Sequence, residues 1–312
     1  MLNKSIKKFF QDSSGGSTGE PIIIYKDKNF LYHSFASELL SLSFCGWKPG
    51  YKIAKLWGAS RDNFLFQTLK GKVLSFFQNI KIYDTFDLSE SRLWQIHQEL
   101  QNWKPDIIVA YASSIYLFAK FLEENKIKPD YPKISIMTSA ETLYPYMREK
   151  IESVFRKKVF DRYGSREVST IACECEKHNG LHIFMDNVIV ECIDSKGNEL
   201  YDEPGELIIT DLNNYALPLI RYRIGDMGVL TKEKCNCGRN TLKLKKLVGR
   251  TSDNFVLKNG KIIHGEYFTH LFYGVEGIKE FQFIQEDFDK FKLKIVKCDN
   301  LMRKSLRKLL AR

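Results

Sequence analysis

The residues best suited to chemistry lie near the middle of the chain, where an apolar, strand-like run ends in Tyr163-Gly164-Ser165 and Glu167 follows. A tyrosine offers a flat aromatic face, a serine offers a hydroxyl, and a glutamate oxygen is a ligand that Mg²⁺ prefers. Glycine at a strand end lets the backbone come close to a ligand. The combination suits a nucleotide, although the same residues could form an ordinary turn between a strand and a loop.

A second candidate segment, residues 13–21, combines glycines with hydroxyl side chains. Its central residues are Ser14, Gly15, Gly16, Ser17, Thr18 and Gly19. The backbone N–H groups and hydroxyls of such a loop can surround phosphate oxygens. No Gly-Lys-Ser/Thr follows, so it is not a Walker A loop, and Gly/Ser-rich segments also serve as linkers. Its position directly before the strand-like run 21–25 favours a phosphate-binding loop.

Two cysteine-containing loops have the chemistry of a closed metal site. Cys175 and His178 are separated by two residues, and Cys235 and Cys237 by one. Three thiolates and one imidazole are the ligands of a structural Zn²⁺. Cys173 is a substitute ligand, and the alternative is a set of unpaired thiols on two loops that happen to approach.

Asp226 is a further candidate, because it follows a glycine and two arginines, Arg221 and Arg223. Its carboxylate could accept hydrogen bonds from both hydroxyls of a ribose. The alternative is a surface aspartate held by one of these arginines.

Alternating strand-like and helical segments between residues 30 and 168 must position these side chains. Strand-like runs occur at 52–57, 81–84, 106–111, 133–137 and 158–160, and helical segments near 62–78, 88–102, 114–126 and 142–156. This alternation predicts βαβ units and a mainly parallel sheet. Ligands of such sheets collect at the carboxyl ends of the strands. Both Thr138–Glu141 and Tyr163–Glu167 fall at such ends.

After residue 168 the pattern changes to short β runs at 181–184, 188–192 and 205–210, with a hairpin turn at 194–197. A last segment opens at 248–253 and contains strands at 281–284 and 292–296, which is typical of the start of a small α/β module with a hinge at Gly249. We therefore expect a large domain over residues 1–249 and a partial small domain over 250–312.

The composition is that of a globular protein, with 312 residues, 44% of them hydrophobic and 28% charged. The sequence contains no run of eighteen apolar residues and no secretory signal, and its seven cysteines are an odd number. These features indicate a cytoplasmic protein that does not bind membranes. The net charge of +10 suits either a polyanion or ATP and coenzyme A. A zinc-containing nucleic-acid binder is disfavoured, because basic–aromatic interleaving and finger spacing are missing.

Taken together, the motifs resemble the adenylate-forming superfamily of acyl-CoA synthetases. The closest branch is the phenylacetate–CoA ligase family, in the subgroup of capsular polysaccharide biosynthesis (CapK-like) proteins. Six segments carry the resemblance and occur in the family's order: Ser14–Pro21, Ser139–Glu141, Tyr163–Glu167, Pro218–Asp226, Cys235–Arg239 and Val248–Asp253.

The resemblance implies an α/β fold in which a parallel βαβ sheet subdomain and a β-rich subdomain form the large domain, followed by the start of a small C-terminal α/β domain. The implied reaction is attack of a carboxylate on the α-phosphate of ATP, giving acyl-AMP and pyrophosphate, and then transfer to coenzyme A. The implied cofactors are ATP/AMP, Mg²⁺, coenzyme A and a structural Zn²⁺. The implied partner is a small-molecule carboxylic acid, and no nucleic-acid partner is implied. The resemblance is also compatible with a homodimer.

The family's pattern also assigns roles to the residues named above. The loop from Ser14 to Gly19 would hold the phosphates, with Thr18 and Glu167 as the catalytic candidates and Glu167 as the Mg²⁺ ligand. Ser165 would touch the α-phosphate beside Gly164. Catalysis of this kind is positioning plus charge neutralisation.

The base and the sugar of the nucleotide are assigned in the same way. Ala140 and Glu141 would lie against the adenine, and Tyr163 would stack beside it. Asp226 and Arg250 would bind the ribose.

The chain departs from the family's pattern at both ends. Family members carry a long segment before the phosphate loop and a catalytic lysine near the C-terminus, whereas Lys292, Lys294 and Lys304 do not lie in that motif. Loss of the lysine would remove several kcal/mol of transition-state stabilisation. We therefore expect a truncated chain with weak or no adenylation. The alternative is an inactive nucleotide- or partner-binding remnant with a structural zinc.

Overall fold

The computed structural model describes residues 2–3, 5–13, 23–57, 79–85, 87–250, 254–256, 258, 262–264 and 278–297. Its main feature is a mixed sheet of eleven strands in the order β10-β11-β12-β13-β9-β8-β7-β6-β5-β3-β4. The half from β4 to β7 is parallel, and the half from β7 to β10 is antiparallel. The parallel βαβ part and the β-rich part predicted from the sequence are therefore continuous with each other.

The parallel strands occupy the segments that the sequence pattern indicates. They are β3 (Ile53–Trp57), β4 (Ile80–Asp84), β5 (Ile107–Tyr111), β6 (Ser135–Ser139) and β7 (Val159–Ser165). The strands in the middle of a parallel sheet are covered on both faces, which explains their nearly continuous apolar runs.

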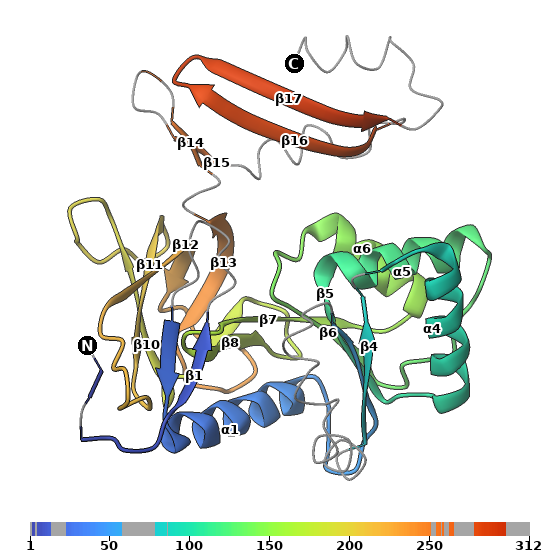
Figure 1. Ribbon diagram of the computed structural model, residues 1–312, viewed down its shortest axis with the longest axis horizontal. Coiled ribbons are helices and arrows are strands. Elements are labelled where there is room, and N and C mark those ends of the chain that lie inside the picture. Colours follow the sequence, from blue (N-terminus) through green and yellow to red (C-terminus); the bar gives the residue numbers. More distant parts are fainter. Residues whose placement is uncertain are drawn as a thin grey trace.

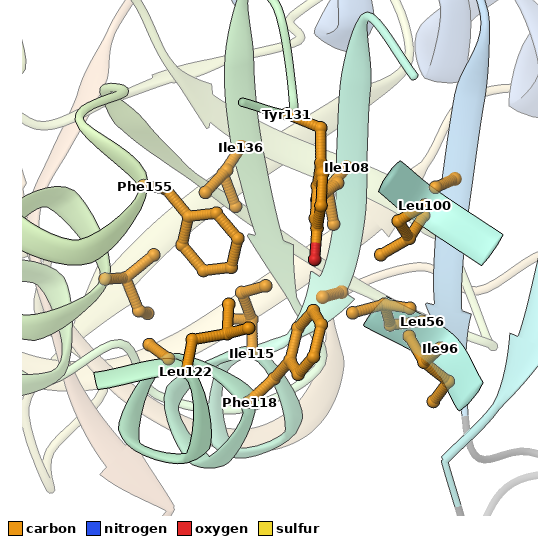
Figure 2. Close-up of a cluster of buried hydrophobic side chains, with 14 of the residues drawn as sticks. Leu56, Ile96, Leu100, Ile108, Ile115, Phe118, Leu122, Tyr131, Ile136 and Phe155 are labelled. Carbon is orange, nitrogen blue, oxygen red and sulfur yellow. The ribbon is translucent and has the colours of Figure 1, made fainter. Parts of the chain in front are cut away.

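Three helices cover one face of this parallel half (Figure 1). They are α4 (Glu90–Trp103), α5 (Ala112–Glu124) and α6 (Pro145–Phe155), close to the predicted helices at 88–102, 114–126 and 142–156. Figure 2 shows side chains of α4 and α5, such as Leu100 and Phe118, packed with Ile108 and Ile136 of the strands. The predicted helix at 62–78 lies outside the described residues.

The opposite face is covered by α1 (Lys28–Phe44), a helix that the sequence pattern did not single out. Leu42 belongs to one buried cluster with Val109, Met137 and Phe160, which alternate along their strands with the residues of the first face. Apolar residues occur all around α1, and Tyr32 and Phe35 are exposed. Without an apolar stripe the helix gives no clear periodic signal. Two short strands, β1 (Phe10–Ser13) and β2 (Ile23–Lys26), pair before it.

The antiparallel half begins with β8 (Ser169–Glu174) and β9 (Leu181–Ile183). It continues with β10 (Val188–Ile193), β11 (Pro204–Asp211), β12 (Tyr222–Thr231) and β13 (Lys243–Arg250). The predicted hairpin turn joins β10 to β11, and Asp194 Oδ1 accepts hydrogen bonds from the N–H groups of Lys196 and Asn198.

The last described elements form two separate hairpins. They are β14 (Asn254–Val256) with β15 (Ile262–His264), and β16 (Ile278–Asp287) with β17 (Lys290–Lys297). The strands predicted at 281–284 and 292–296 are thus confirmed. The ring of Phe255 lies 5.5 Å from that of Phe283 and 6.2 Å from that of Phe291, so β14 packs on the longer hairpin. Among the residues that the structure describes, no helix is both long and apolar enough to cross a bilayer.

Candidate functional site

The carboxyl ends of β5, β6 and β7 bring two of the predicted motifs to one edge of the sheet. Tyr111 is in register with Ser139, and Ser139 with Arg162. The segments that follow, Ser139–Glu141 and Tyr163–Ser165, therefore emerge side by side. Ala140 has a φ of 70°, a conformation that non-glycine residues rarely adopt and that turns the chain sharply at the end of β6. The predicted placement at strand ends is confirmed.

Gly164 fixes the hairpin that carries Glu167. The register between β7 and β8 shifts next to Gly164, and a Cβ atom there would lie 2.6 Å from the carbonyl oxygen of Ser169. Only glycine allows this approach. The turn after Ser165 contains Glu167 and ends at Val168, whose N–H donates to Ser165 Oγ at 3.4 Å. From the sequence, this glycine was expected to let a ligand approach the backbone; in the structure the group that approaches it is the carbonyl of Ser169.

Asp226 meets Tyr163 although 62 residues lie between them in the sequence. The hydroxyl of Tyr163 donates to Asp226 Oδ2 at 2.7 Å, and Asp226 is in register with Arg250 across β12 and β13. The two preceding arginines have partners of their own, since Arg221 pairs with Glu191 and Arg223 with Glu206. Three segments that the family resemblance assigned to one nucleotide therefore lie next to one another.

Glu141 supports the start of α5. Its Oε2 accepts the backbone N–H of Ser113 at 2.8 Å, at a helix N-terminus where a negative charge is favourable. The interaction ties the end of β6 to the first turn of the helix that follows β5.

The structure brings together three of the four predicted metal ligands, and a different histidine takes the fourth position. Cys175, Cys235 and Cys237 gather with His182, and the ligand atoms of these four residues lie within 4.8 Å of one another. The prediction of His178 is corrected: its Nδ1 lies 3.2 Å from Glu174 Oε2 instead. The substitute ligand Cys173 also lies outside the cluster.

The position of His182 follows from the pairing of short strands. β9 lies between β8 and β13, with Cys173 and Lys243 as the neighbours of His182 in register. This places its ring over the two cysteine loops. The Nδ1 atom of His182 lies 2.8 Å from the hydroxyl of Thr241, and its Nε2 lies 3.4 Å from Cys237 Sγ. A hydrogen bond at Nδ1 directs the lone pair of Nε2 toward a metal.

The geometry and charges of the cluster fit Zn²⁺. The sulfur atoms of Cys175 and Cys235 are 3.7 Å apart, close to the roughly 3.8 Å that separates two thiolates on a tetrahedral zinc. Burial raises the pKa of Cys237, but the N–H and guanidinium of Arg239 outweigh burial and lower it to about 7. The buried ammonium of Lys243 adds a second positive charge beside His182. Burial raises the pKa of the Cys175 thiol to about 12, so a bound cation is needed to stabilise its thiolate.

A buried network of charges connects the cysteine loop with β7. Arg148 forms two hydrogen bonds, of 2.8 and 2.9 Å, with the carboxylate of Glu174, which also accepts the N–H of Asp161. Burial, together with the charge of Glu174, raises the pKa of Asp161 to about 7, although Thr138 donates a hydrogen bond to it. Sequence reasoning missed this network, because its members come from separate elements and form no motif.

The raised pKa makes a prediction for Asp161→Asn. Asp161 has a folded-state pKa of about 7 and an unfolded value of about 3.9, so its contribution to stability is present below about pH 4 and is lost as the pH rises through 7. The variant should therefore gain about 1–3 kcal/mol over the wild type at pH 8 and little at pH 4. Chemical unfolding across this pH range measures the difference. If the difference in stability between the variant and the wild type is the same at pH 4 and pH 8, Asp161 is ionised in the folded protein over this range and the prediction is wrong.

Several predicted positions lie outside the described residues. They are the six residues of the phosphate loop, Ser14, Gly15, Gly16, Ser17, Thr18 and Gly19. Arg250 is described for its backbone alone.

Comparison with proteins of known sequence gives consistent relatives. Residues 255–312 match the CapK C-terminal domain. Protein CapK of Staphylococcus aureus is 26% identical over 295 residues, covering 93% of this chain and 64% of CapK. A phenylacetate-coenzyme A ligase of Thermus thermophilus is 26% identical over 255 residues, covering 79% of this chain and 55% of that protein. The chain thus spans less than two thirds of the length of these relatives.

Solved structures share the fold. 2-Hydroxyisobutyryl-CoA ligase, in its postadenylation state with 2-HIB-AMP, superposes with a TM-score of 0.76 at 18% identity, covering 96% of this chain and 65% of that one. O-succinylbenzoate coenzyme A synthetase of Bacillus subtilis, in complex with AMP, gives 0.67 at 16% identity, with coverages of 96% and 62%.

The fold is therefore that of the adenylate-forming acyl-CoA ligases. Within this class, the relatives in sequence are CapK and the phenylacetate–CoA ligases. The resemblance predicted from the six motifs is confirmed.

Proposed function

We propose that the chain contributes the nucleotide site of an enzyme that adenylates a carboxylic acid and transfers the acyl group to coenzyme A. The observation that carries the proposal is the 2.7 Å hydrogen bond between Tyr163 and Asp226, with Arg250 beside Asp226 in register. It joins the strand-end motif of β7 to the late aspartate of β12. The relatives named phenylacetate-coenzyme A ligase support this chemistry.

In this site each residue has a distinct role. The ring of Tyr163 stacks on the adenine, with Ala140 and Glu141 beside it. Asp226 accepts hydrogen bonds from the ribose hydroxyls, with Arg250 as the second ribose residue. The hydrogen bond from Tyr163 fixes one carboxylate oxygen of Asp226 in advance, which lowers the cost of ordering on binding.

The triphosphate end completes the site. Ser165 contacts the α-phosphate, Glu167 binds Mg²⁺, and the loop Ser14–Gly19 with Thr18 holds the phosphates. Mg²⁺ would neutralise the charge that develops on the transferred group. The residues of this chain bind and orient the carboxylate and the α-phosphate for attack.

The metal cluster has a structural role in this proposal. Cys175, His182, Cys235 and Cys237 use all four positions of a tetrahedral Zn²⁺, so the ion would offer no open position for a substrate. It would join the β8–β9 loop to the segment before β13, on which Arg250 lies.

The division of the chain is also a proposal. Gly249, near the end of β13, has a φ of 128°, and among the described residues a Cβ atom there would meet no atom within 4 Å. This backbone conformation suits a hinge between a large domain over 1–249 and a partial small domain over 250–312.

Replacement of Asp226 by alanine tests the nucleotide site. Loss of a charged acceptor for the ribose should weaken binding of Mg·ATP by about ten- to a hundredfold in isothermal titration calorimetry. The matched control is Asp194→Ala in an exposed hairpin turn, which should bind as the wild type does. Equal affinity of the Asp226 variant and the wild type would contradict the assignment. Pyrophosphate release with a panel of acids then separates adenylation from ATP binding without turnover, the alternative role of an inactive remnant.

A further inference from the structure

Arg162 lies directly before Tyr163 on β7 and has an unusual environment. It is half-buried, and its Nε–H donates to Ser139 Oγ at 3.3 Å. Among the residues that the structure describes, no carboxylate forms an ion pair with its guanidinium. Removing a cation from water without a directly paired carboxylate is costly, so a half-buried arginine of this kind is suited to a bound anion.

The strand geometry places Arg162 on the side of the sheet away from Tyr163. Successive side chains of a strand point to opposite faces, so Arg162 shares the face of Phe160, which packs in the same cluster as Leu42 of α1. Along this face, the register Tyr111–Ser139–Arg162 forms a row at the carboxyl ends of three parallel strands.

The row from Tyr111 to Arg162 has an aromatic end at Tyr111 and a positively charged end at Arg162. The rings of Trp57 and Tyr111 lie 4.4 Å apart at the end nearer β3. Lys55, two residues before Trp57 on the same face, pairs with Glu38 of α1 at 2.7 Å. Lys55, and to a smaller extent Arg162, hold the pKa of Glu38 at about 2 although burial opposes this. Glu38 is therefore ionised and paired with Lys55, and among the described residues no carboxylate forms an ion pair with Arg162.

We propose that Arg162, oriented by Ser139, binds a second, negatively charged group of the acid substrate, so that the site prefers dicarboxylates to acids with an apolar tail. The inference rests on the proposed adenylation function, since it assigns the substrate of the same site. With Nε on Ser139, the two terminal NH₂ groups can bind a carboxylate bidentately.

The distance along β7 determines which end of the substrate Arg162 meets. Three residues of strand separate it from Ser165, or about 10 Å. This separation of the Cα atoms fits a guanidinium that holds the far end of the acid, while the carboxylate that is activated lies at the proposed α-phosphate contact. The aromatic pair Trp57 and Tyr111 forms an apolar wall for the carbon chain between the two ends.

The test compares acids that differ in one charged group. Phenylacetate is compared with its para-carboxymethyl derivative, and hexanoate with adipate, by calorimetric titration of the full zinc-loaded chain with and without Mg·ATP. The wild type should bind each dicarboxylate about ten- to a hundredfold more tightly than its monocarboxylate partner. Arg162→Gln should reduce the ratio to about one, and Arg162→Lys should keep part of it. The matched control, Arg223→Gln at an exposed arginine, should keep the full ratio.

Each result decides the assignment. A wild type without a preference for the dicarboxylate in either pair overturns it, and so does a preference that survives in Arg162→Gln. If that variant does not fold, as judged by zinc content and thermal unfolding, the ratio in Arg162→Lys against the control decides instead. Binding of Mg·ATP is measured in the same samples, so a failure of the nucleotide site is seen separately from a failure of the acid preference.

Discussion

Replacing His182 by asparagine is expected to abolish zinc binding, whereas the same change at His178 is expected to leave it intact. Nε2 of His182 lies 3.4 Å from Cys237 Sγ in the metal cluster, while His178 contacts Glu174. Three thiolates alone form an incomplete tetrahedron, and the free energy of metal binding contributes to folding. The His182 variant should therefore also lose several kcal/mol of stability.

Metal analysis of the purified variants, together with thermal unfolding before and after chelation, measures both effects. The wild type and His178→Asn should each carry about one equivalent of zinc. Cys175→Ser serves as the positive control for loss, because its Sγ lies 3.7 Å from that of Cys235. Loss of zinc in the His178 variant and retention in the His182 variant would reverse the assignment of the fourth ligand.

Replacing Arg148 by methionine is expected to lower the stability of the fold strongly. The guanidinium binds both oxygens of Glu174, whose side chain is 9% exposed, and Asp161 lies beside that carboxylate. Without Arg148 two buried acids would share one site. Breaking a buried pair by removing one partner costs about 3–5 kcal/mol, because the remaining charge is uncompensated.

Denaturant unfolding measures this cost against two comparisons. Arg223→Met removes an exposed pair with Glu206 and should cost at most about 1 kcal/mol. The double variant Arg148→Met with Glu174→Gln should recover part of the loss, because the unpaired charge is removed as well. Equal costs for the Arg148 and Arg223 variants would show that the buried network contributes little.

Much of the fold could be predicted because local patterns agree with the overall topology. The apolar runs of β3, β5 and β6 alternate with helices whose buried residues recur at helical spacing, such as Leu93, Ile96 and Leu100. This alternation determines a parallel sheet with its ligand edge at the strand ends. α1 could not be predicted in this way, because its apolar residues do not lie on one side.

In the site, too, features that depend on nearby residues could be predicted, whereas contacts between distant segments could not. The residue types of the metal cluster and its two cysteine loops could be predicted from spacing, but the choice between His178 and His182 depends on the pairing of β9 with β13. That Tyr163 and Asp226 lie at one site was expected from the family resemblance alone, since nothing local links these residues, and their direct hydrogen bond was not predicted. Arg162 was missed because a single arginine before a motif carries no pattern.

The structure of the chain with bound AMP is the most direct test of the claim that distant segments form one nucleotide site. The account predicts adenine against the ring of Tyr163 and beside Ala140, with the ribose hydroxyls within hydrogen-bond distance of Asp226. AMP bound on another surface, with Tyr163 and Asp226 still joined to each other and untouched by the ligand, would contradict it.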